Sequence, residues 1–363
     1  METTSVVLPP QLVLAQSTVY ASQGSIYALD ANNGTLRQQY ETQGLVCPAI
    51  ENDVIYAKVS RHPTYMIQAL RVSDGSLLWS YQLEEGGSSS PVVVGSVLYA
   101  NSSGSTSALH ISDGSLIWHY ETGPILFASP TVIDGVVYLS PAVNPPSKPF
   151  IYALDARKGA FLWRSQIPDS TSYPLTVGDG VIYMSSHSGC FALRVGDGSS
   201  IWHSKTRGQP RSSPGVTDEM ACITLSEFKQ EFSFESRQFR HWQEVFVAAL
   251  RISDGSVLWQ RQLGADTSAA NPTAPVVANG MIYVGTDDGY LSALQAGDGA
   301  LFWRYKTGGT LLSSPVMTNE VIYVGASDGY VYALRVNDGS LLWRTFVSTS
   351  VTGSISIHIK ERE

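Results

Sequence analysis

The chain has 363 residues, of which 43% are hydrophobic and 10% aromatic, enough apolar side chain to fill a large core. Its formal net charge is -8 and only 15% of its residues are charged, which excludes the clustered Lys and Arg of a polyanion-binding surface, so nucleic acid is not an expected partner. Length alone would allow two or three ordinary domains, but internal repeats overrule that count.

One sequence pattern returns along the whole chain, and ALRVSDGSLLW at Ala69–Trp79 is a clear copy of it. Eight units of about forty residues fill the chain when they are aligned on the turn glycine of this pattern. These glycines are Gly34, Gly75, Gly114, Gly159, Gly198, Gly255, Gly299 and Gly339.

Each unit carries four strand signals, which are clearest in the segment Ser313–Phe346. Its runs PVM, VIYVG, YVYALRV and LLWRTF are separated by the turn-forming clusters TNE, SDG and NDG. The unit is therefore expected to be a four-stranded antiparallel meander, with strands A to D in chain order. Because one small sheet cannot bury both of its faces, we expect an all-β, eight-bladed β-propeller forming a single domain over residues 1–363. A linear solenoid is the competing arrangement.

The repeated turn and the repeated tryptophan are both interpreted as structural. The Asp-Gly or Asn-Gly pair, replaced by Lys158-Gly159 in one copy, predicts a tight C to D hairpin loop. In such a loop Gly adopts positive φ and Asn or Asp tolerates it. The tryptophan four residues later suits the seam between adjacent blades, where the indole N–H meets a carbonyl. These docking residues are Trp79, Trp118, Trp163, Trp202, Trp259, Trp303 and Trp343, and the first unit has Gln38 in their place.

The pattern Ala-Leu-x-x-x-Asp-Gly-x-x-x-Trp, with strand A opening at Ser90-Pro91 and Ser314-Pro315, resembles the repeat of the PQQ-like β-propellers. That bacterial family includes quinoprotein alcohol dehydrogenases and the BamB-type assembly lipoprotein of the outer membrane. The resemblance implies the propeller fold and favours the non-catalytic branch. It also implies an extracytoplasmic location, either periplasmic or at the cell surface.

Two segments compete to complete the first blade. Pro10–Ser22 supplies strand signals at the start of the chain, and Ser354–Lys360, SISIHIK, alternates at its end. The sequence leaves open which segment joins the last blade to the first.

Departures from the repeat are the places where function is expected, because binding residues concentrate on loops carried by a rigid scaffold. The long connections fall on the face that carries the B to C and D to A loops: Lys58–Met66, Ser140–Phe150, Ser226–Val245 and Gln262–Thr273. The candidate partner-binding residues on this face are Arg61, His62, Tyr65, Asn144, Lys148, Phe228, Phe232, Phe234, Arg237, Phe239 and Trp242.

The blade 6 insertion at about 226–245 has two interpretations. Alternating Phe and charged residues favour a hairpin that prolongs strands B and C and turns near Glu235–Gln238. Aromatic spacings of 3, 4 and 7 residues suit an amphipathic helix instead. In a third, purely structural interpretation these aromatic residues only pack onto the propeller.

Catalytic chemistry finds little support. Cys47, Cys190 and Cys222 are too scattered for a zinc site and are expected to be buried free thiols. GTDDGY at Gly285–Tyr290 is interpreted as an ordinary B to C turn rather than a calcium loop. By the resemblance, a quinoprotein dehydrogenase would need PQQ, a calcium ion, a carboxylate base and adjacent cysteines. No catalytic residue, metal or cofactor is therefore assigned, and PQQ with calcium is the alternative.

We expect a non-enzymatic, monomeric scaffold that binds a protein or peptide, with a surface polymer or glycan as the other candidate partner. The alternatives are a PQQ-dependent quinoprotein oxidoreductase and a glycan-binding sensor module. The start METTSVVLPPQLVLAQ is acidic and has no clear cleavage site, so no signal peptide is expected. No stretch is apolar enough for a transmembrane segment.

Overall fold

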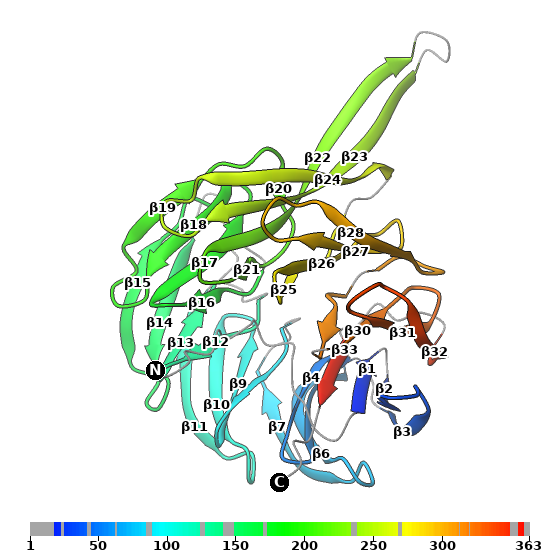
Figure 1. Cartoon of the computed structure of the whole chain (residues 1–363). Helices are drawn as coiled ribbons and strands as arrows, with labels where there is room; N and C mark the ends of the chain where they lie inside the picture. The colour runs from blue at the N-terminus through cyan, green and yellow to red at the C-terminus, as the bar shows by residue number, and fades with distance from the viewer. Residues whose placement is uncertain are drawn as a thin grey trace. The chain divides into compact units, whose positions relative to one another are not determined.

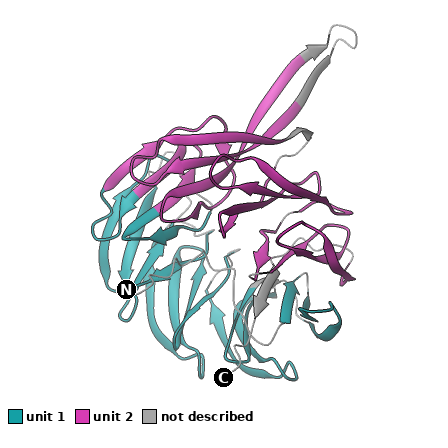
Figure 2. Cartoon of the chain, viewed as in Figure 1, with its two compact units in different colours: residues 1–182, 193–199, 353–363 teal, residues 183–192, 200–352 magenta. Residues whose placement is uncertain are grey.

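The computed structural model describes residues 18–22, 25–41, 45–61, 64–84, 89–123, 128–140, 149–169, 173–233, 238–267, 271–311, 313–318, 320–348 and 355–358. Every regular element in these ranges is a β-strand, and the strands form eight antiparallel sheets. The predicted fold class, an all-β, eight-bladed β-propeller, is confirmed. The chain divides into two compact units, residues 1–182, 193–199 and 353–363 and residues 183–192 and 200–352 (Figure 2). That residues 1–363 form one domain stays a prediction.

Unit 1 contains the sheets of blades 1 to 4, and Figure 1 labels most of their strands. Blade 1 consists of β1 (Thr18–Ser22), β2 (Ser25–Asp30), β3 (Leu36–Glu41) and β33 (Ile355–His358). Blade 2 consists of β4 (Leu45–Glu51), β5 (Val54–Arg61), β6 (Thr64–Arg71) and β7 (Leu77–Leu83). Blade 3 consists of β8 (Val92–Val94), β9 (Val97–Ser102), β10 (Ser105–His110) and β11 (Leu116–Glu121). Blade 4 consists of β12 (Thr131–Ile133), β13 (Val136–Leu139), β14 (Phe150–Asp155) and β15 (Phe161–Gln166).

Blade 5 is divided between the units and consists of β16 (Thr176–Gly178), β17 (Val181–Ser186), β18 (Gly189–Arg194) and β19 (Ser200–Ser204). Unit 2 contains blades 6 to 8. In blade 6, strand A is split, giving β20 (Gln209–Pro210), β21 (Gly215–Val216), β22 (Met220–Ser233), β23 (Gln238–Arg251) and β24 (Val257–Thr267). Blade 7 consists of β25 (Val276–Ala278), β26 (Met281–Gly285), β27 (Tyr290–Gln295) and β28 (Leu301–Lys306). Blade 8 consists of β29 (Val316–Met317), β30 (Val321–Gly325), β31 (Tyr330–Arg335) and β32 (Leu341–Phe346).

The docking role predicted for the tryptophans is confirmed at six of them. Trp79 Nε1 donates to the Ile111 carbonyl of the next blade at 2.8 Å, and the ring lies against Gly114, where an added Cβ would come within 2.5 Å of it. The acceptor always lies three residues before the turn glycine, and the same bond is made by Trp118, Trp163, Trp202, Trp259 and Trp303. Each seam therefore combines buried aromatic area with a satisfied indole N–H.

The expectation for the Asp-Gly pair was only half right. The turn glycines do have positive φ, for example +71° at Gly75. The preceding Asp, however, is not among the described residues with positive φ, and the C to D connection is longer than a two-residue loop. Asp74 Oδ1 instead accepts a hydrogen bond from the Ser76 N–H at 2.9 Å, and the equivalent aspartates repeat this bond. Asp is therefore used because its side chain closes an Asx turn.

Blade 1 shows which segment supplies its fourth strand and which residue takes the place of the absent tryptophan. β33 pairs antiparallel with β1, so the C-terminal segment supplies the fourth strand of blade 1. Its side chains, and residues 1–17, lie outside the described part of the chain. The absent tryptophan is replaced by Tyr40, whose ring lies against Gly75 and whose hydroxyl donates to the Val72 carbonyl. Val72 also lies three residues before its glycine, so Tyr40 occupies the docking position from two residues further along the strand.

The described thiols behave as expected. Cys190 and Cys222 are free and fully buried, and burial raises the pKa of both to about 12. The side chain of Cys47 lies outside the described residues. No helix in the described part is long and apolar enough to cross a membrane.

Candidate functional site

The largest departure from the repeat is a long hairpin in blade 6 (Figure 1). β22 and β23 are each 14 residues long and pair without a register shift from Met220 opposite Arg251 to Ser233 opposite Gln238. The hairpin interpretation of the insertion is confirmed, and the amphipathic helix is wrong. β20 accompanies β22 only as far as Ser226, and β24 accompanies β23 only as far as Gln243. We call Glu227–Ser233 and Gln238–Glu244 the arm, which begins at the opposite pair Glu227 and Glu244, next to the ends of the two flanking strands.

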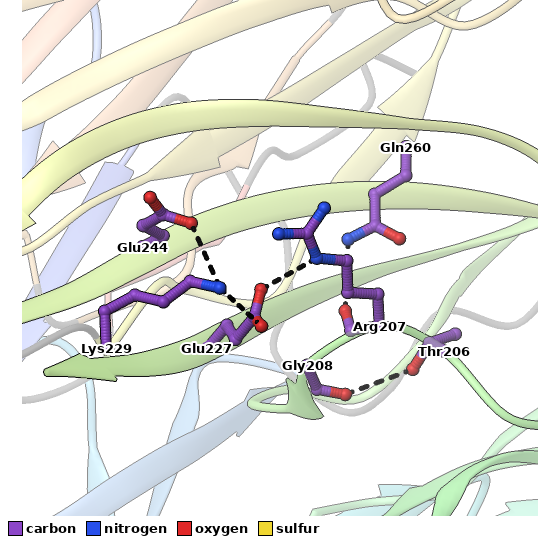
Figure 3. Close-up of polar contacts among 7 residues, drawn as sticks. All are labelled: Thr206, Arg207, Gly208, Glu227, Lys229, Glu244 and Gln260. Carbon is purple, nitrogen blue, oxygen red and sulfur yellow. Dashed lines mark hydrogen bonds and ion pairs between the residues drawn. The ribbon is translucent and has the colours of Figure 1, made fainter.

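The root of the arm carries a small network of charges (Figure 3). Glu227 and Glu244 are directly opposite in the register, and two like charges in such a pair repel each other. Lys229 relieves this repulsion, because its Nζ lies 2.6 Å from Glu227 Oε1 and 4.0 Å from Glu244 Oε2. Arg207 adds a second cation, with its Nε 2.9 Å from Glu227 Oε2. The root of the arm is thus held by alternating charges.

These contacts favour the ionised form of Glu227 and fix the loop that precedes blade 6. The hydrogen bond from Lys229, followed by that from Arg207, holds the pKa of Glu227 below its usual value against the opposing effect of desolvation. The Arg207 guanidinium also lies 5.7 Å from the centre of the Phe246 ring. Gln260 Nε2 donates to the Arg207 carbonyl at 3.0 Å, so β24 is tied to the same loop.

The two faces of the arm differ in chemistry. Residues directly opposite in an antiparallel pair share a face, so Trp242 lies on the same face as its partner Lys229 and the charged root. Phe228, opposite Gln243, lies on the other face. Phe228 is 61% exposed, whereas Trp242 is half-buried. Phe228 is one of several exposed large apolar side chains, and it lies on the face of the arm away from the charged root.

The other predicted partner-binding residues are only partly located. Phe232 and Phe239 are opposite each other in the register, but their side chains lie outside the described residues, as does that of Arg61 at the end of β5. Tyr65 in β6 is half-buried and packs against the hydrophobic cluster around Trp79, which gives it a structural role. The remaining candidates lie outside the described residues: His62, Asn144, Lys148, Phe234 and Arg237. That all of these residues share one face stays a prediction.

Sequence reasoning missed the charged residues at the root. Glu227 and Lys229 were visible only as the polar half of an alternating pattern. Their pairing with Glu244 depends on the hairpin register, and Arg207 comes from the loop before β20, so neither partner carries a local sequence signal.

Three observations on the described residues bear on a quinone and calcium site. Among them, no three His, Cys, Asp or Glu side chains are grouped closely enough to hold a metal ion. Cys190 on β18 and Cys222 on β22 lie in different sheets, so they do not form the adjacent pair that the resemblance would require. In the GTDDGY segment the Asp288 carboxylate is held by Arg304, with Nη2 to Oδ2 at 3.1 Å, as expected for an ordinary turn.

Comparison with known proteins identifies a family whose model matches most of this chain. A family model described as outer membrane protein assembly factor BamB matches residues 4–125, 66–227 and 243–359. The assembly factor BamB of Yersinia pestis is 26% identical over 174 residues, which cover 44% of this chain and 39% of the Yersinia protein. This chain thus matches less than half the length of these curated relatives.

Solved structures agree on the fold. BamB from Moraxella catarrhalis superposes with a TM-score of 0.68 at 20% identity, covering 92% of this chain and 98% of that chain. Quinohemoprotein alcohol dehydrogenase from Comamonas testosteroni gives a TM-score of 0.69 at 13% identity, covering 92% and 74%. At such identities the likeness shows the fold alone, since one fold hosts many functions.

The family model does not match most of the arm. Residues 228–242, which include Phe228 and Trp242, lie between the ranges matched by the family model. The root residues Glu227 and Glu244 lie at the two ends of the matched ranges or just inside them. Most of the arm therefore lies outside the residues that the family model matches.

Proposed function

Because this chain belongs to the family of the outer membrane protein assembly factor BamB, we propose that it is a non-enzymatic scaffold that binds another protein through the blade 6 arm. A location outside the cytoplasm, a role in assembling outer-membrane proteins and a monomeric state belong to the same proposal.

The observation that carries this proposal is the construction of the arm. An isolated two-stranded ribbon is marginally stable in water, yet this one extends beyond its supporting strands on a root fixed by Arg207 and Lys229. It carries Phe228 into solvent, and aromatic residues are the usual anchors of protein interfaces. A ribbon whose root is already held by these ion pairs has less conformational freedom to lose when a partner binds.

We propose to test whether the arm is the contact surface by site-specific photo-cross-linking in cells that express the protein. A photoreactive phenylalanine analogue is placed at Phe228 and, as a matched control, at Phe302, which is 54% exposed on β28. We expect a discrete protein adduct from position 228 and none from position 302. Equal adducts from both positions, or none from either, would refute the arm as the binding element.

A deletion gives an independent test. Replacing 228–243 by Asn-Gly, a tight hairpin turn that keeps Glu227 opposite Glu244, should leave a cooperative thermal unfolding transition slightly below that of wild type, because Lys229 no longer lies between these two carboxylates. The variant should no longer co-purify with the cross-linked partner. Because the deletion removes many contacts, Phe228→Ser serves as the milder variant, with the same expected loss of binding. Retention of the partner by both variants contradicts the proposal.

The alternative hypothesis, a PQQ-dependent quinoprotein oxidoreductase, predicts cofactor binding and catalysis, and both can be assayed. The purified protein is mixed with PQQ and calcium, and the absorbance spectrum and dye-linked alcohol oxidation are recorded. We expect neither quinone uptake nor turnover, because the described residues contain no group of three His, Cys, Asp or Glu side chains that could hold the ion. Stoichiometric uptake of PQQ together with alcohol oxidation would contradict the scaffold proposal and support the enzyme.

A further inference from the structure

Two repeat positions meet in the seam between neighbouring blades. One lies two residues after the docking tryptophan, and the other lies immediately before the repeat alanine of strand C in the next blade. Between blades 7 and 8 both are tyrosines, Tyr305 and Tyr332, with ring centroids 6.2 Å apart. The Gly308 N–H donates to the Tyr332 hydroxyl at 3.0 Å. The two tyrosine rings fill this part of the seam.

Between blades 6 and 7 the same two positions are Arg261 and Ser292. A cleft of about 400 Å³ lies there, because a guanidinium and a hydroxymethyl group replace two aromatic rings. Its lining includes Arg261, Ser292, Arg304, Leu263, Leu294 and Leu301.

The cleft contains one cation without a compensating carboxylate. Arg304 is paired with Asp288 at 3.1 Å and lies 3.5 Å from the centre of the Tyr290 ring, so its charge is matched. Arg261 Nε donates to the Asp298 carbonyl at 3.0 Å, which orients the guanidinium. Within the described part of the chain its terminal nitrogens have no hydrogen-bond or ion-pair partner. An oriented guanidinium with free terminal N–H groups is a fork that matches a carboxylate.

A second donor lines the same cleft. Ser292 is only 1% exposed, and among the described residues its hydroxyl has no hydrogen-bond partner. A buried polar group without a partner costs free energy that a ligand can recover. The leucine side chains Leu263, Leu294 and Leu301 complete the lining and disfavour a fully hydrated inorganic ion.

We propose that the cleft between blades 6 and 7 binds a carboxylate carried on an apolar stem, with Arg261 and Ser292 as its donors. A small carboxylic acid and a glutamate flanked by apolar residues in a polypeptide share this chemistry. The proposal does not depend on the arm, because no residue of the arm lines the cleft.

Isothermal titration calorimetry of the full-length protein tests this site with three probes. Pentanoate is the small carboxylate, pentanamide is its uncharged counterpart, and a blocked pentapeptide with one glutamate between leucines is the polypeptide form. We expect pentanoate to bind at least tenfold more tightly than pentanamide. Tighter binding of the peptide than of pentanoate assigns the site to a polypeptide ligand, and weaker binding assigns it to a small acid.

Two variants test separately the charge of Arg261 and the open volume of the cleft. Arg261→Gln removes the cation and keeps the cleft, and Ser292→Tyr restores the residue found at Tyr332 and fills it. Each should weaken pentanoate binding at least tenfold. The matched control Arg251→Gln removes an exposed cation of the same blade and should leave the affinity within twofold.

Thermal unfolding confirms that the three variants are folded before titration. Equal affinity of wild type and Arg261→Gln, equal binding of pentanoate and pentanamide, or no binding of pentanoate and the peptide to wild type would each overturn the proposal.

Discussion

Replacing Lys58 by methionine is expected to stabilise the protein at neutral pH. Lys58 lies in β5 at the strand B position that is Ser22, Asn101, Ser140 or Ser185 in other blades, and it is only 2% exposed. Its Nζ donates to the Asn101 carbonyl at 2.6 Å, and among the described residues no carboxylate pairs with it. The ammonium is therefore a buried charge with one hydrogen bond.

The magnitude follows from the pKa. Burial lowers the pKa of Lys58 from 10.5 to about 8, a difference of about 2.5 pH units, or about 3 kcal/mol at 1.36 kcal/mol per unit. Methionine keeps most of the apolar stem but removes the 2.6 Å hydrogen bond to the Asn101 carbonyl, from which the Ser89 hydroxyl lies 3.5 Å away, and this loss costs about 1 to 2 kcal/mol. The net expectation is a gain of about 1 to 2 kcal/mol at pH 7.

Urea unfolding followed by tryptophan fluorescence measures this difference at several pH values. The folded-state pKa of Lys58 is depressed, so the unfolded chain binds more protons between pH 8 and 10.5 and wild-type stability gains with pH in that window. The advantage of Lys58→Met should be largest below pH 8 and shrink as pH rises toward 10.5. A variant that is less stable than wild type at pH 7, by an amount independent of pH, would refute the argument.

Two further predictions concern the seams. Gly114→Ala should cost more than about 2 kcal/mol in thermal unfolding, because the new Cβ lies within 2.5 Å of the Trp79 ring at φ +72°, whereas Gly95→Ala, at φ +59° with nothing within 4 Å, should cost only about 1 kcal/mol. Equal losses would mean that ring contact is unimportant. Tyr40→Phe should cost about 1 kcal/mol through the lost bond to the Val72 carbonyl. Because burial raises the pKa of Tyr40 to about 12, wild-type stability should fall as pH rises above 10, and this fall should be smaller in Tyr40→Phe; unfolding midpoints that fall equally would contradict it.

The repeat made the architecture predictable because each blade needs the same turn, the same alanine and the same docking ring. The glycine and tryptophan roles followed from conformational freedom and apolar area, which are local properties. The role of Asp74 was assigned wrongly because an Asx bond and a tolerance of positive φ favour the same residue types. Tyr40 was missed because it lies two residues beyond Gln38, where the alignment expected the ring.

The functional features were less accessible to sequence reasoning. The hairpin of blade 6 followed from alternation, but the charge pairing of Glu227 with Lys229 and Glu244 requires a register that only the fold supplies. The cleft depends on Arg261 and Ser292, which belong to different units of the repeat. Each substitution is visible in an alignment of the copies, but that the two residues face one cavity is a property of blade packing.

The pairing of β33 with β1 has a consequence for biosynthesis. Thr18 is synthesised roughly 340 residues before its strand partner His358. Throughout translation the first sheet therefore presents an unsatisfied strand border, which is the kind of edge that recruits foreign strands and seeds aggregation. Blade 1 therefore gains its fourth strand only after the strands of the other seven blades have been synthesised.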